Sequence, residues 1–567
     1  MAFKARFTRV LLAVAASSAL LAGCGTGNPQ DSNGQEAQET QESTSGSGLD
    51  GTQLLTIPRE DMGTFERNFN PFSNPDFPMT HQAVFESMLI FNPADGSTVP
   101  WLAEEWTVAD DGTGLTFTLR DDVKWSDGTP LTADDVVLTF DLQREIRGGF
   151  DYIGTVTAVD PQTVQFDFLE PFSPALLDIG QQIIAPAHVW GEVDDPTTFA
   201  NETPVGTGPY TEVVNFQAQS FELGKNPNYW QPEKQQIEGI RMLAFAGNDG
   251  ANLAAANGDV DWAPQFIPNI EESYVAKDPE NRFFWFPPTG SMINWQFNTT
   301  KAPFDDPNVR KALSMAVDRE QVTSIGMQGY TTPADCTGLS GAYDSWRDED
   351  LVESCDWTER DLEGAGKLLD EAGITLGADG KRVLPDGSPF EFEYSVGSTS
   401  SDWVSVGNVI AQNLAELGVT VRVAARDWGD VVAGYENGTF DSGVVWSAGA
   451  PTPYQFYTGM MSTETVKPVG EQTFENYHRY GNPEADALLE EFAAASDEAD
   501  QQEIMGELQA LFAESAPVAP LFPGPEWGAA SSERFTGWPN ADNPYATLSV
   551  RARTAVLILT SLQPVQD

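Results

Sequence analysis

The stretch of chain from Leu54 to the C-terminus is too long for a single hydrophobic core. It holds about 515 of the 567 residues, and single cores stop growing at about 250–300 residues. After residue 24 it contains no apolar run of the roughly 20 residues that a membrane helix needs. The sequence therefore predicts a large, water-exposed body that is built from two or three globular units.

The first 24 residues predict an export signal that ends at a lipid attachment site. Three basic residues precede an apolar stretch, residues 10–23, which has the length of a signal-peptide core. The ending Leu-Ala-Gly-Cys resembles the lipobox of bacterial lipoproteins, in which the cysteine is lipidated and becomes the first residue. We therefore expect removal of residues 1–23 and anchoring of Cys24 at the outer face of the cell membrane. An ordinary secretory signal with an incidental cysteine is the alternative.

Residues 24–53 have the composition of a flexible tether. They are mostly Gly, Ser, Thr, Asn, Gln, Glu and Asp, without an aromatic residue. Such a segment cannot bury enough apolar surface to offset the entropy lost on ordering. We expect the folded body to begin near Leu54.

The charge of the chain excludes one class of partner. With 85 acidic and 30 basic residues, the formal net charge is −55, and such a surface repels phosphate backbones. The three histidines lie far apart in sequence, and no Cys/His cluster has metal-ligand spacing. We expect a monomer without a metal, a cofactor or a nucleic-acid partner.

Cys336 and Cys355 are the only cysteines besides Cys24, and they lie 19 positions apart. Outside the cell, two such cysteines pair more often than they stay free. Closing a loop of this size would stabilise the fold by about 3 kcal/mol in the chain-entropy model. We predict that they form a structural disulfide.

The apolar periodicity predicts mixed α/β organisation. Residues 115–120 alternate as a half-buried strand, and Asp306-Pro307 is typical of a helix start. Apolar residues at helical spacing over 406–417 stop at a glycine, and residues 419–423 follow as a strand. A further helix is predicted over 503–513. The passage from helix to strand indicates a crossover unit of a parallel sheet.

Several sequence blocks occur in the order of a known family. They are Pro-Trp-Leu-Ala-Glu-Glu-Trp at 100–106, Val-Lys-Trp-Ser-Asp-Gly-Thr-Pro at 123–130, Gly-Thr-Gly-Pro-Tyr at 206–210, Asn-Pro-Asn-Tyr-Trp at 226–230 and Val-Arg-Lys-Ala-Leu at 309–313. Together they resemble the family 5 solute-binding proteins, the extracytoplasmic receptors of ABC importers for oligopeptides, dipeptides, nickel and some oligosaccharides. Physically, most of these residues are typical of turns and core aromatics.

The resemblance implies an α/β, bilobal periplasmic-binding-protein-like fold of type II, in its large cluster C form, with an extra inserted domain and a hinge between the lobes. Carried onto this chain, lobe I comprises residues 54–85, 203–297 and 521–567, the inserted domain residues 86–202, and lobe II residues 298–520. The hinge is then expected near Phe297-Asn298 and Pro520-Leu521. Binding free energy alone would drive closure over a solute.

The resemblance points to a ligand class through residues 446–454. In peptide-binding relatives an aspartate in this segment captures the amino terminus of the peptide, and Gly449 stands at that position here. The Gly-Ala-Pro-Thr-Pro-Tyr sequence at 449–454, with Asn-Phe-Asn-Pro-Phe at 68–72, is instead similar to the members that bind cello- or other β-linked oligosaccharides. We expect an oligosaccharide ligand, with an oligopeptide as the alternative.

A sugar-binding cleft needs flat aromatic side chains flanked by hydrogen-bonding groups, because sugars present apolar ring faces and hydroxyl edges. Most of the 15 Trp, 13 Tyr and 33 Phe must be core residues. The candidate ring platforms are Trp446, Tyr454, Trp428 and Trp295, and the candidate hydrogen-bonding residues are Asn68, Asn70, Asn294 and Asp427.

A secreted glycoside hydrolase is the alternative from another class. Among 85 acidic residues, some pair will always lie about 5–10 Å apart, so their abundance is no evidence for catalysis. No segment has a recognisable catalytic arrangement. We therefore predict a receptor and not an enzyme. The resemblance implies that the partner of this receptor is an ABC permease in the same membrane.

Overall fold

The computed structural model describes residue 49 and residues 51–73, 76–287, 289–447 and 449–566. The predicted signal segment, Cys24 and nearly all of the predicted tether lie outside these residues. Residues 47–567 form one compact unit. Within the described ranges, every helix falls short of the length or the apolarity that a membrane crossing needs.

The first sheet contains the strand that opens the folded body. Its strands are β1 (Leu54–Arg59), β8 (Tyr210–Gln217), β9 (Ser220–Lys225) and β10 (Gly239–Ala244), in the order β1-β10-β9-β8. β1 pairs in parallel with β10, whereas β10, β9 and β8 are antiparallel neighbours. The start of the body therefore lies beside residues that follow about 180 positions later in sequence.

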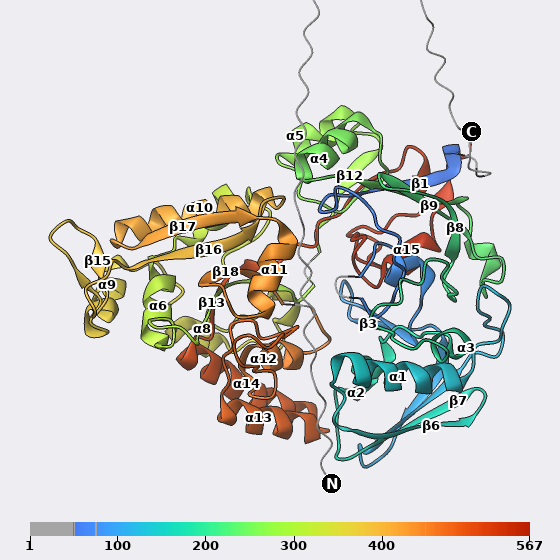
Figure 1. Ribbon diagram of the computed structural model, residues 1–567, viewed down its shortest axis with the longest axis horizontal. Helices are drawn as coiled ribbons and strands as arrows, with labels where there is room; N and C mark the ends of the chain where they lie inside the picture. Colours follow the sequence, from blue (N-terminus) through green and yellow to red (C-terminus); the bar gives the residue numbers. More distant parts are fainter. Residues whose placement is uncertain (1–48, 50, 74–75, 288, 448, 567) are drawn as a thin grey trace, which may run out of the picture. The chain divides into compact units, whose positions relative to one another are not determined.

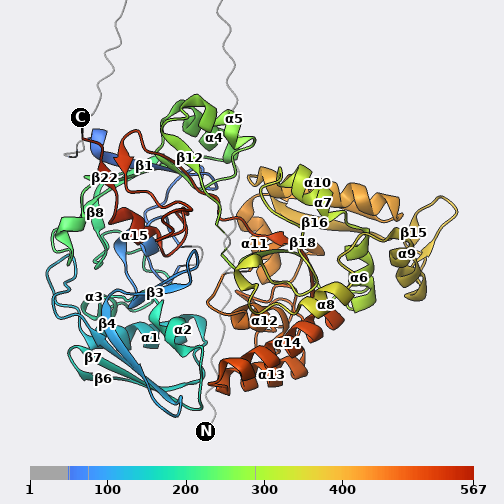
Figure 2. The same cartoon turned by 180° about the vertical axis from the view of Figure 1, so that it is seen from behind.

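The inserted segment forms its own antiparallel sheet. The strands are β4 (Ala103–Val108), β5 (Gly114–Leu119), β6 (Ile153–Asp160) and β7 (Thr163–Phe168), in the order β4-β5-β7-β6. Helix α1 (Ala133–Arg147) lies against this sheet (Figure 2). In β5, Leu115, Phe117 and Leu119 are buried and alternate with half-buried residues, which confirms the strand predicted at 115–120.

The third large sheet is mixed. It runs β17-β16-β18-β13-β19, from β13 (Met292–Phe297), β16 (Glu391–Gly397), β17 (Thr420–Arg426), β18 (Ser442–Trp446) and β19 (Val518–Pro523). β16 is parallel to β17 and β18, and β13 is antiparallel to β18 and β19. Helix α10 (Ser401–Glu416) connects β16 to β17 and packs on both (Figure 1). The predicted crossover unit is confirmed.

Helices surround this third sheet. The Asp306 carboxylate accepts the Asn308 N–H at 2.8 Å and caps α6, which confirms the helix start that the Asp-Pro pair predicted. The predicted helix at 503–513 lies within α14. The helices of this part are α6 (Pro307–Ala316), α7 (Arg319–Gln321), α8 (Glu349–Ser354), α9 (Leu362–Glu371), α11 (Trp428–Glu436), α12 (Tyr454–Met461), α13 (Pro483–Ala494) and α14 (Glu498–Ser515).

Smaller elements complete the fold. The short strands are β2 (Leu89–Asn92), β3 (Ser97–Pro100), β11 (Trp262–Ala263), β12 (Arg282–Phe284), β14 (Thr375–Leu376), β15 (Arg382–Val383), β20 (Ala529–Ser531), β21 (Phe535–Thr536) and β22 (Gln563–Pro564). The remaining α-helices are α2 (Ala175–Gly180), α3 (Ala187–Trp190), α4 (Asn248–Asn257), α5 (Ile270–Ser273) and α15 (Ala555–Leu559).

Separate hydrophobic cores divide the body into two lobes. One core draws its buried residues from 55–262 and 530–562, and two adjoining cores draw theirs from 292–522. β13 pairs with β18, so it belongs to lobe II and not to lobe I, where the expected boundary at Phe297 placed it. Pro520-Leu521 lies inside β19. The structure thus places both crossings between the lobes outside the expected hinge positions, before Met292 and after Pro523.

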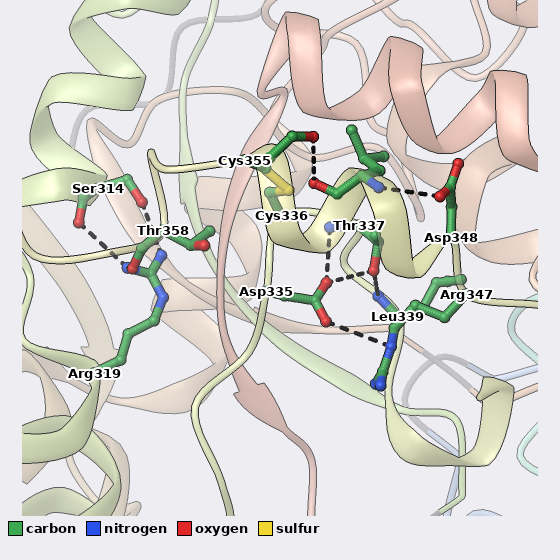
Figure 3. The surroundings of a disulfide bond; sticks show 12 residues. Ser314, Arg319, Asp335, Cys336, Thr337, Leu339, Arg347, Asp348, Cys355 and Thr358 are labelled. Carbon is green, nitrogen blue, oxygen red and sulfur yellow. Dashed lines mark hydrogen bonds and ion pairs between the residues drawn. A yellow bond between two sulfur atoms is a disulfide. The ribbon is translucent and has the colours of Figure 1, made fainter.

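Two buried arginines attach β19 to the helices of lobe II. Arg310 donates to the carbonyl oxygens of Ser515 and Ala516, each at 2.7 Å, just before β19 begins. Arg319 donates to the Pro520 carbonyl at 2.9 Å. It also donates to the Thr358 carbonyl at 2.6 Å and to Ser314 Oγ at 2.8 Å (Figure 3). The planar guanidinium satisfies several carbonyls at once, so these contacts hold β19 to lobe II.

A disulfide joins Cys336 to Cys355, whose Cα atoms lie 6.4 Å apart. Cys355 directly follows helix α8 (Figure 3). Beside the bridge, the Asp335 carboxylate accepts the Thr337 N–H at 2.9 Å and lies 3.8 Å from the Arg347 side chain. The bridge thus links a hydrogen-bonded turn to the end of a short helix in lobe II.

Three of the sequence blocks that carry the family resemblance meet at one buried carboxyl group, that of Glu86. Its Oε1 accepts the Trp101 indole N–H at 2.8 Å and the Tyr229 hydroxyl at 3.2 Å. Thr207 and Trp230 also contact it, and burial raises the pKa of Glu86 to about 7. These residues come from the blocks at 100–106, 206–210 and 226–230, so these three blocks act here as structural parts of the junction between lobe I and the inserted domain.

Candidate solute-binding site

Three tryptophans gather at one edge of the lobe II sheet. Because β16, β17 and β18 are parallel, their carboxyl ends lie at the same edge, where open α/β sheets bind ligands. Trp446 is the last residue of β18, Trp428 begins the helix that follows β17, and Trp403 lies in the first turn of the helix that follows β16. We call Trp403, Trp428 and Trp446 the tryptophan cluster.

The rings of the tryptophan cluster contact one another and remain accessible. The centroid of Trp446 lies 5.8 Å from those of both Trp403 and Trp428, and the latter two are 6.2 Å apart. Trp446 is 49% exposed, and its two neighbours are half-buried. A large indole with this exposure at the end of a buried strand offers an apolar face to a ligand.

Local hydrogen bonds fix the backbone around the tryptophan cluster. Asp427 caps α11, since its Oδ1 accepts the Gly429 N–H at 2.9 Å. Asp402, next to Trp403, is buried, and burial raises the pKa of its carboxyl group to about 6. From lobe I, Asn248 Nδ2 donates to Ser401 Oγ at 3.5 Å. The cluster therefore lies next to a contact between the lobes.

The structure contradicts a ligand-contacting role for Trp295 and Asn294. Both are fully buried in β13. The Trp295 ring packs on Phe297, with centroids 4.4 Å apart, and on Phe392. A ring enclosed in the core cannot offer its face to a solute. Both residues, which lie near the predicted hinge, belong instead to β13, an inner strand of the lobe II sheet whose residues are all buried.

Asn68 and Asn70 hold a loop of lobe I in place. Asn70 is buried, its Nδ2 donates to the Pro196 carbonyl at 2.8 Å, and its Oδ1 accepts the Phe72 N–H at 2.8 Å. Asn68 Oδ1 accepts the Asn70 N–H at 3.2 Å. These amides form Asx turns and a link to the inserted domain. Asn70 is thus buried and uses its amide in bonds within the protein, which does not favour the predicted role in sugar binding.

Tyr454 also lies outside the tryptophan cluster. It begins α12, stacks on Phe492 of α13 with a centroid distance of 5.4 Å, and meets the edge of Phe172 at 5.9 Å. Phe172 belongs to the inserted domain. The ring that we predicted as a ligand platform therefore takes part in a contact between the inserted domain and lobe II.

Gly449 follows the strand that ends in Trp446 and passes very close to another part of the chain. A Cβ atom on Gly449 would stand 1.8 Å from the Thr289 carbonyl oxygen. Nearby, Ser447 N–H donates to the Met292 carbonyl at 2.9 Å. A side chain has no room at this position, so the missing aspartate has a structural cause.

Trp403 is the residue that the sequence analysis missed. Its signal was its position in the first turn after a strand, which is also the position of Trp428 relative to its own strand. Of the four predicted ring platforms, the structure brings together Trp428 and Trp446 only, and it adds Trp403.

Comparisons with known proteins agree with this architecture. The family described as bacterial extracellular solute-binding proteins, family 5 Middle, matches residues 97–467. Protein XP55 of Streptomyces lividans is 29% identical over 398 residues, which is 68% of each chain. The glutathione-binding protein GsiB of Escherichia coli K12 is 27% identical over 442 residues, which is 74% of this chain and 79% of GsiB.

Two solved structures extend the comparison over nearly the whole body. A periplasmic oligopeptide-binding protein of an ABC transporter from Thermotoga maritima, crystallised with mannohexaose, has a TM-score of 0.84 at 26% identity and covers 92% of this chain and 100% of its own. The oligopeptide-binding protein AppA of Bacillus subtilis, in complex with a nonapeptide, has a TM-score of 0.77 at 20% identity, over 90% of this chain and 99% of AppA, and shares the fold. The chain thus has the bilobal type II periplasmic-binding fold and belongs to the family 5 extracellular solute-binding proteins, the substrate-binding proteins of ABC importers.

Proposed function

We propose that the protein captures an oligosaccharide by stacking sugar rings on the tryptophan cluster. The main observation in support is the set of three indoles, with Trp446 49% exposed, at the carboxyl ends of three parallel strands. Flat apolar faces match the faces of pyranose rings. The mannohexaose in the similar Thermotoga maritima protein supports this ligand class. The relevant linkage in this proposal is the β-linked, cello-type one.

An oligopeptide is the second candidate. The names of similar proteins favour it, since one is called an oligopeptide-binding protein and another a glutathione-binding protein. Indoles also pack against apolar side chains of peptides. However, the Thr289 carbonyl leaves no room for a side chain at position 449, so a peptide amino terminus would need a different anionic partner.

We further propose that the receptor works as an anchored protein. Cys24 carries the lipid, the residues between it and the compact unit that starts at residue 47 form the tether, and the folded body delivers its solute unchanged to an ABC permease in the same membrane. Two or more acyl chains would hold it stably, whereas one would not. Replacing Cys24 with Ser should release the protein into the medium. Retention of the variant at the membrane would contradict the anchor.

Titrations with defined oligomers test the ligand class. Indole fluorescence and calorimetry would be recorded with cellohexaose, mannohexaose, xylo- and malto-oligosaccharides, and with tri- to nonapeptides. We expect saturable binding of a β-linked oligosaccharide, which mass spectrometry then recovers intact. Shortened sugar would indicate a hydrolase. Binding of peptides without binding of any sugar would overturn the proposal.

A matched pair of variants connects binding to the tryptophan cluster. Trp446→Ala should weaken binding about tenfold, since loss of one ring contact is worth about 1.4 kcal/mol. Phe474→Ala is the control, because Phe474 is also exposed, at 46%, and lies outside the cluster. If the two variants bound the solute with equal affinity, the tryptophan cluster would not be the binding site.

A further inference from the structure

The loop between β7 and α2 of the inserted domain contacts lobe II through Ser173. The Ser173 N–H donates to the Ala493 carbonyl at 2.7 Å, and Ser173 Oγ donates to the Phe492 carbonyl at 3.3 Å. Gln501 Nε2 donates in turn to Ser173 Oγ at 3.0 Å. These partners lie more than 300 positions away in sequence, at the end of α13 and the start of α14.

A row of aromatic rings accompanies these hydrogen bonds. Tyr152 stacks on Phe172 with centroids 3.7 Å apart, Phe172 meets Tyr454 edge-on at 5.9 Å, and Tyr454 stacks on Phe492 at 5.4 Å. The first two rings belong to the inserted domain and the last two to lobe II. The contact therefore combines directional hydrogen bonds with apolar burial.

The loop is held in place before it reaches lobe II. Leu169 N–H donates to the Tyr152 carbonyl at 2.8 Å, and Phe172 N–H donates to the Gly112 carbonyl at 3.2 Å. Pro171 and Pro174 flank the two contacting residues and restrict their backbone. A loop with so little freedom loses little entropy when it docks.

We propose that Phe172 and Ser173 form a latch that holds the inserted domain to lobe II, and that this latch must release before solute enters or leaves. The family fold opens by bending at the two crossings between the lobes, and any such opening that separates lobe II from the inserted domain breaks these contacts. The latch residues lie outside the tryptophan cluster. The inference therefore does not depend on which solute the cluster binds.

Hydrogen exchange in the full-length mature chain without solute tests the latch directly. With residue-level readout by mass spectrometry, the Ser173 amide should exchange at least tenfold more slowly than an unprotected loop amide, because it is bonded across the lobes. Exchange of the wild-type Ser173 amide at the unprotected rate would overturn the proposal without any variant.

The double variant Phe172→Ala/Gln501→Ala tests whether the contact holds the lobes together. Loss of one hydrogen bond and one aromatic contact between the inserted domain and lobe II should raise the exchange rate of Ser173 by about tenfold. X-ray scattering should show a larger radius of gyration. Gln502→Ala is the matched control, because Gln502 is an exposed neighbour on α14. A double variant with wild-type exchange and radius would overturn the latch.

Discussion

The carbonyl oxygen of Thr289 lies only 1.8 Å from the point where Gly449 would carry a Cβ atom. Thr289 belongs to the crossing that leads into lobe II, and Gly449 follows the strand that ends in Trp446. The two backbones can approach this closely only because one of them has no side chain. The close approach holds the first crossing against the end of the strand that carries the exposed indole.

Substitution of Gly449 should therefore destabilise the fold. Gly449→Ala should lower the free energy of unfolding by about 2 kcal/mol, since overpacking forces the backbone to shift. Thermal and urea unfolding measure the effect. Gly459→Ala is the control, because a Cβ there meets nothing within 4 Å and the residue lies inside helix α12. A Gly449→Ala protein as stable as the control would contradict the close approach.

The buried carboxyl group of Glu86 should make stability depend on pH. Its pKa is raised from 4.5 to about 7 in the folded protein, so between these values the folded state binds more protons than the unfolded state. The free energy of unfolding should then fall by up to about 3 kcal/mol as the pH rises from 4.5 to 7. Glu86→Gln has no charge to bury, so urea unfolding should show a smaller pH dependence. The same dependence in both proteins would rule out Glu86 as the cause.

Replacement of two tryptophans should change the stability of the fold by very different amounts. Trp295→Ala should cost about 3–5 kcal/mol of stability, because it leaves a cavity in the core of lobe II. Trp446→Ala should change stability by less than about 0.5 kcal/mol, because the ring is exposed. Calorimetric melting compares the two. Equal losses of stability would mean that Trp446 is also a packing residue.

Removal of the disulfide should destabilise the fold without affecting solute capture. The double variant Cys336→Ser/Cys355→Ser should lose about 3 kcal/mol, since the unfolded chain gains the freedom of a 19-residue loop. A reducing agent should lower the melting temperature of the wild-type protein and leave that of the double variant unchanged. If the reducing agent left the wild-type melting temperature unchanged too, the bridge would have no part in stability.

Local features of the fold could be predicted from the sequence because their signals are local. The Asp306 cap, the alternation in β5 and the passage from α10 into β17 depend on a few consecutive residues. The boundary between the lobes was misplaced because it depends on the pairing of β13 with β18, whose residues lie about 150 positions apart. The residue pattern within either strand does not predict which strand it pairs with.

The candidate site shows the same division. Trp446 was chosen because its segment resembles one that relatives use for ligand, and Trp428 was chosen as a flat aromatic residue; the structure brings the two rings together. Trp295 could not be told from a ligand platform, since the buried strand β13 carries Asn294 and Gln296 beside its aromatic residues, a composition that also suits a cleft wall. For Tyr454, the deciding neighbour was Phe172, which lies in a different domain.

The attachment of β19 by Arg310 and Arg319 has a mechanical consequence. Because both guanidinium groups bind carbonyls at or just before this strand, the returning chain travels with lobe II as a single rigid piece. We therefore expect rotation of one lobe against the other to bend the backbone outside these strands, before Met292 and after Pro523. Two chain connections join the lobes, and two connections restrict the motion to one hinge bending more strongly than a single connection would.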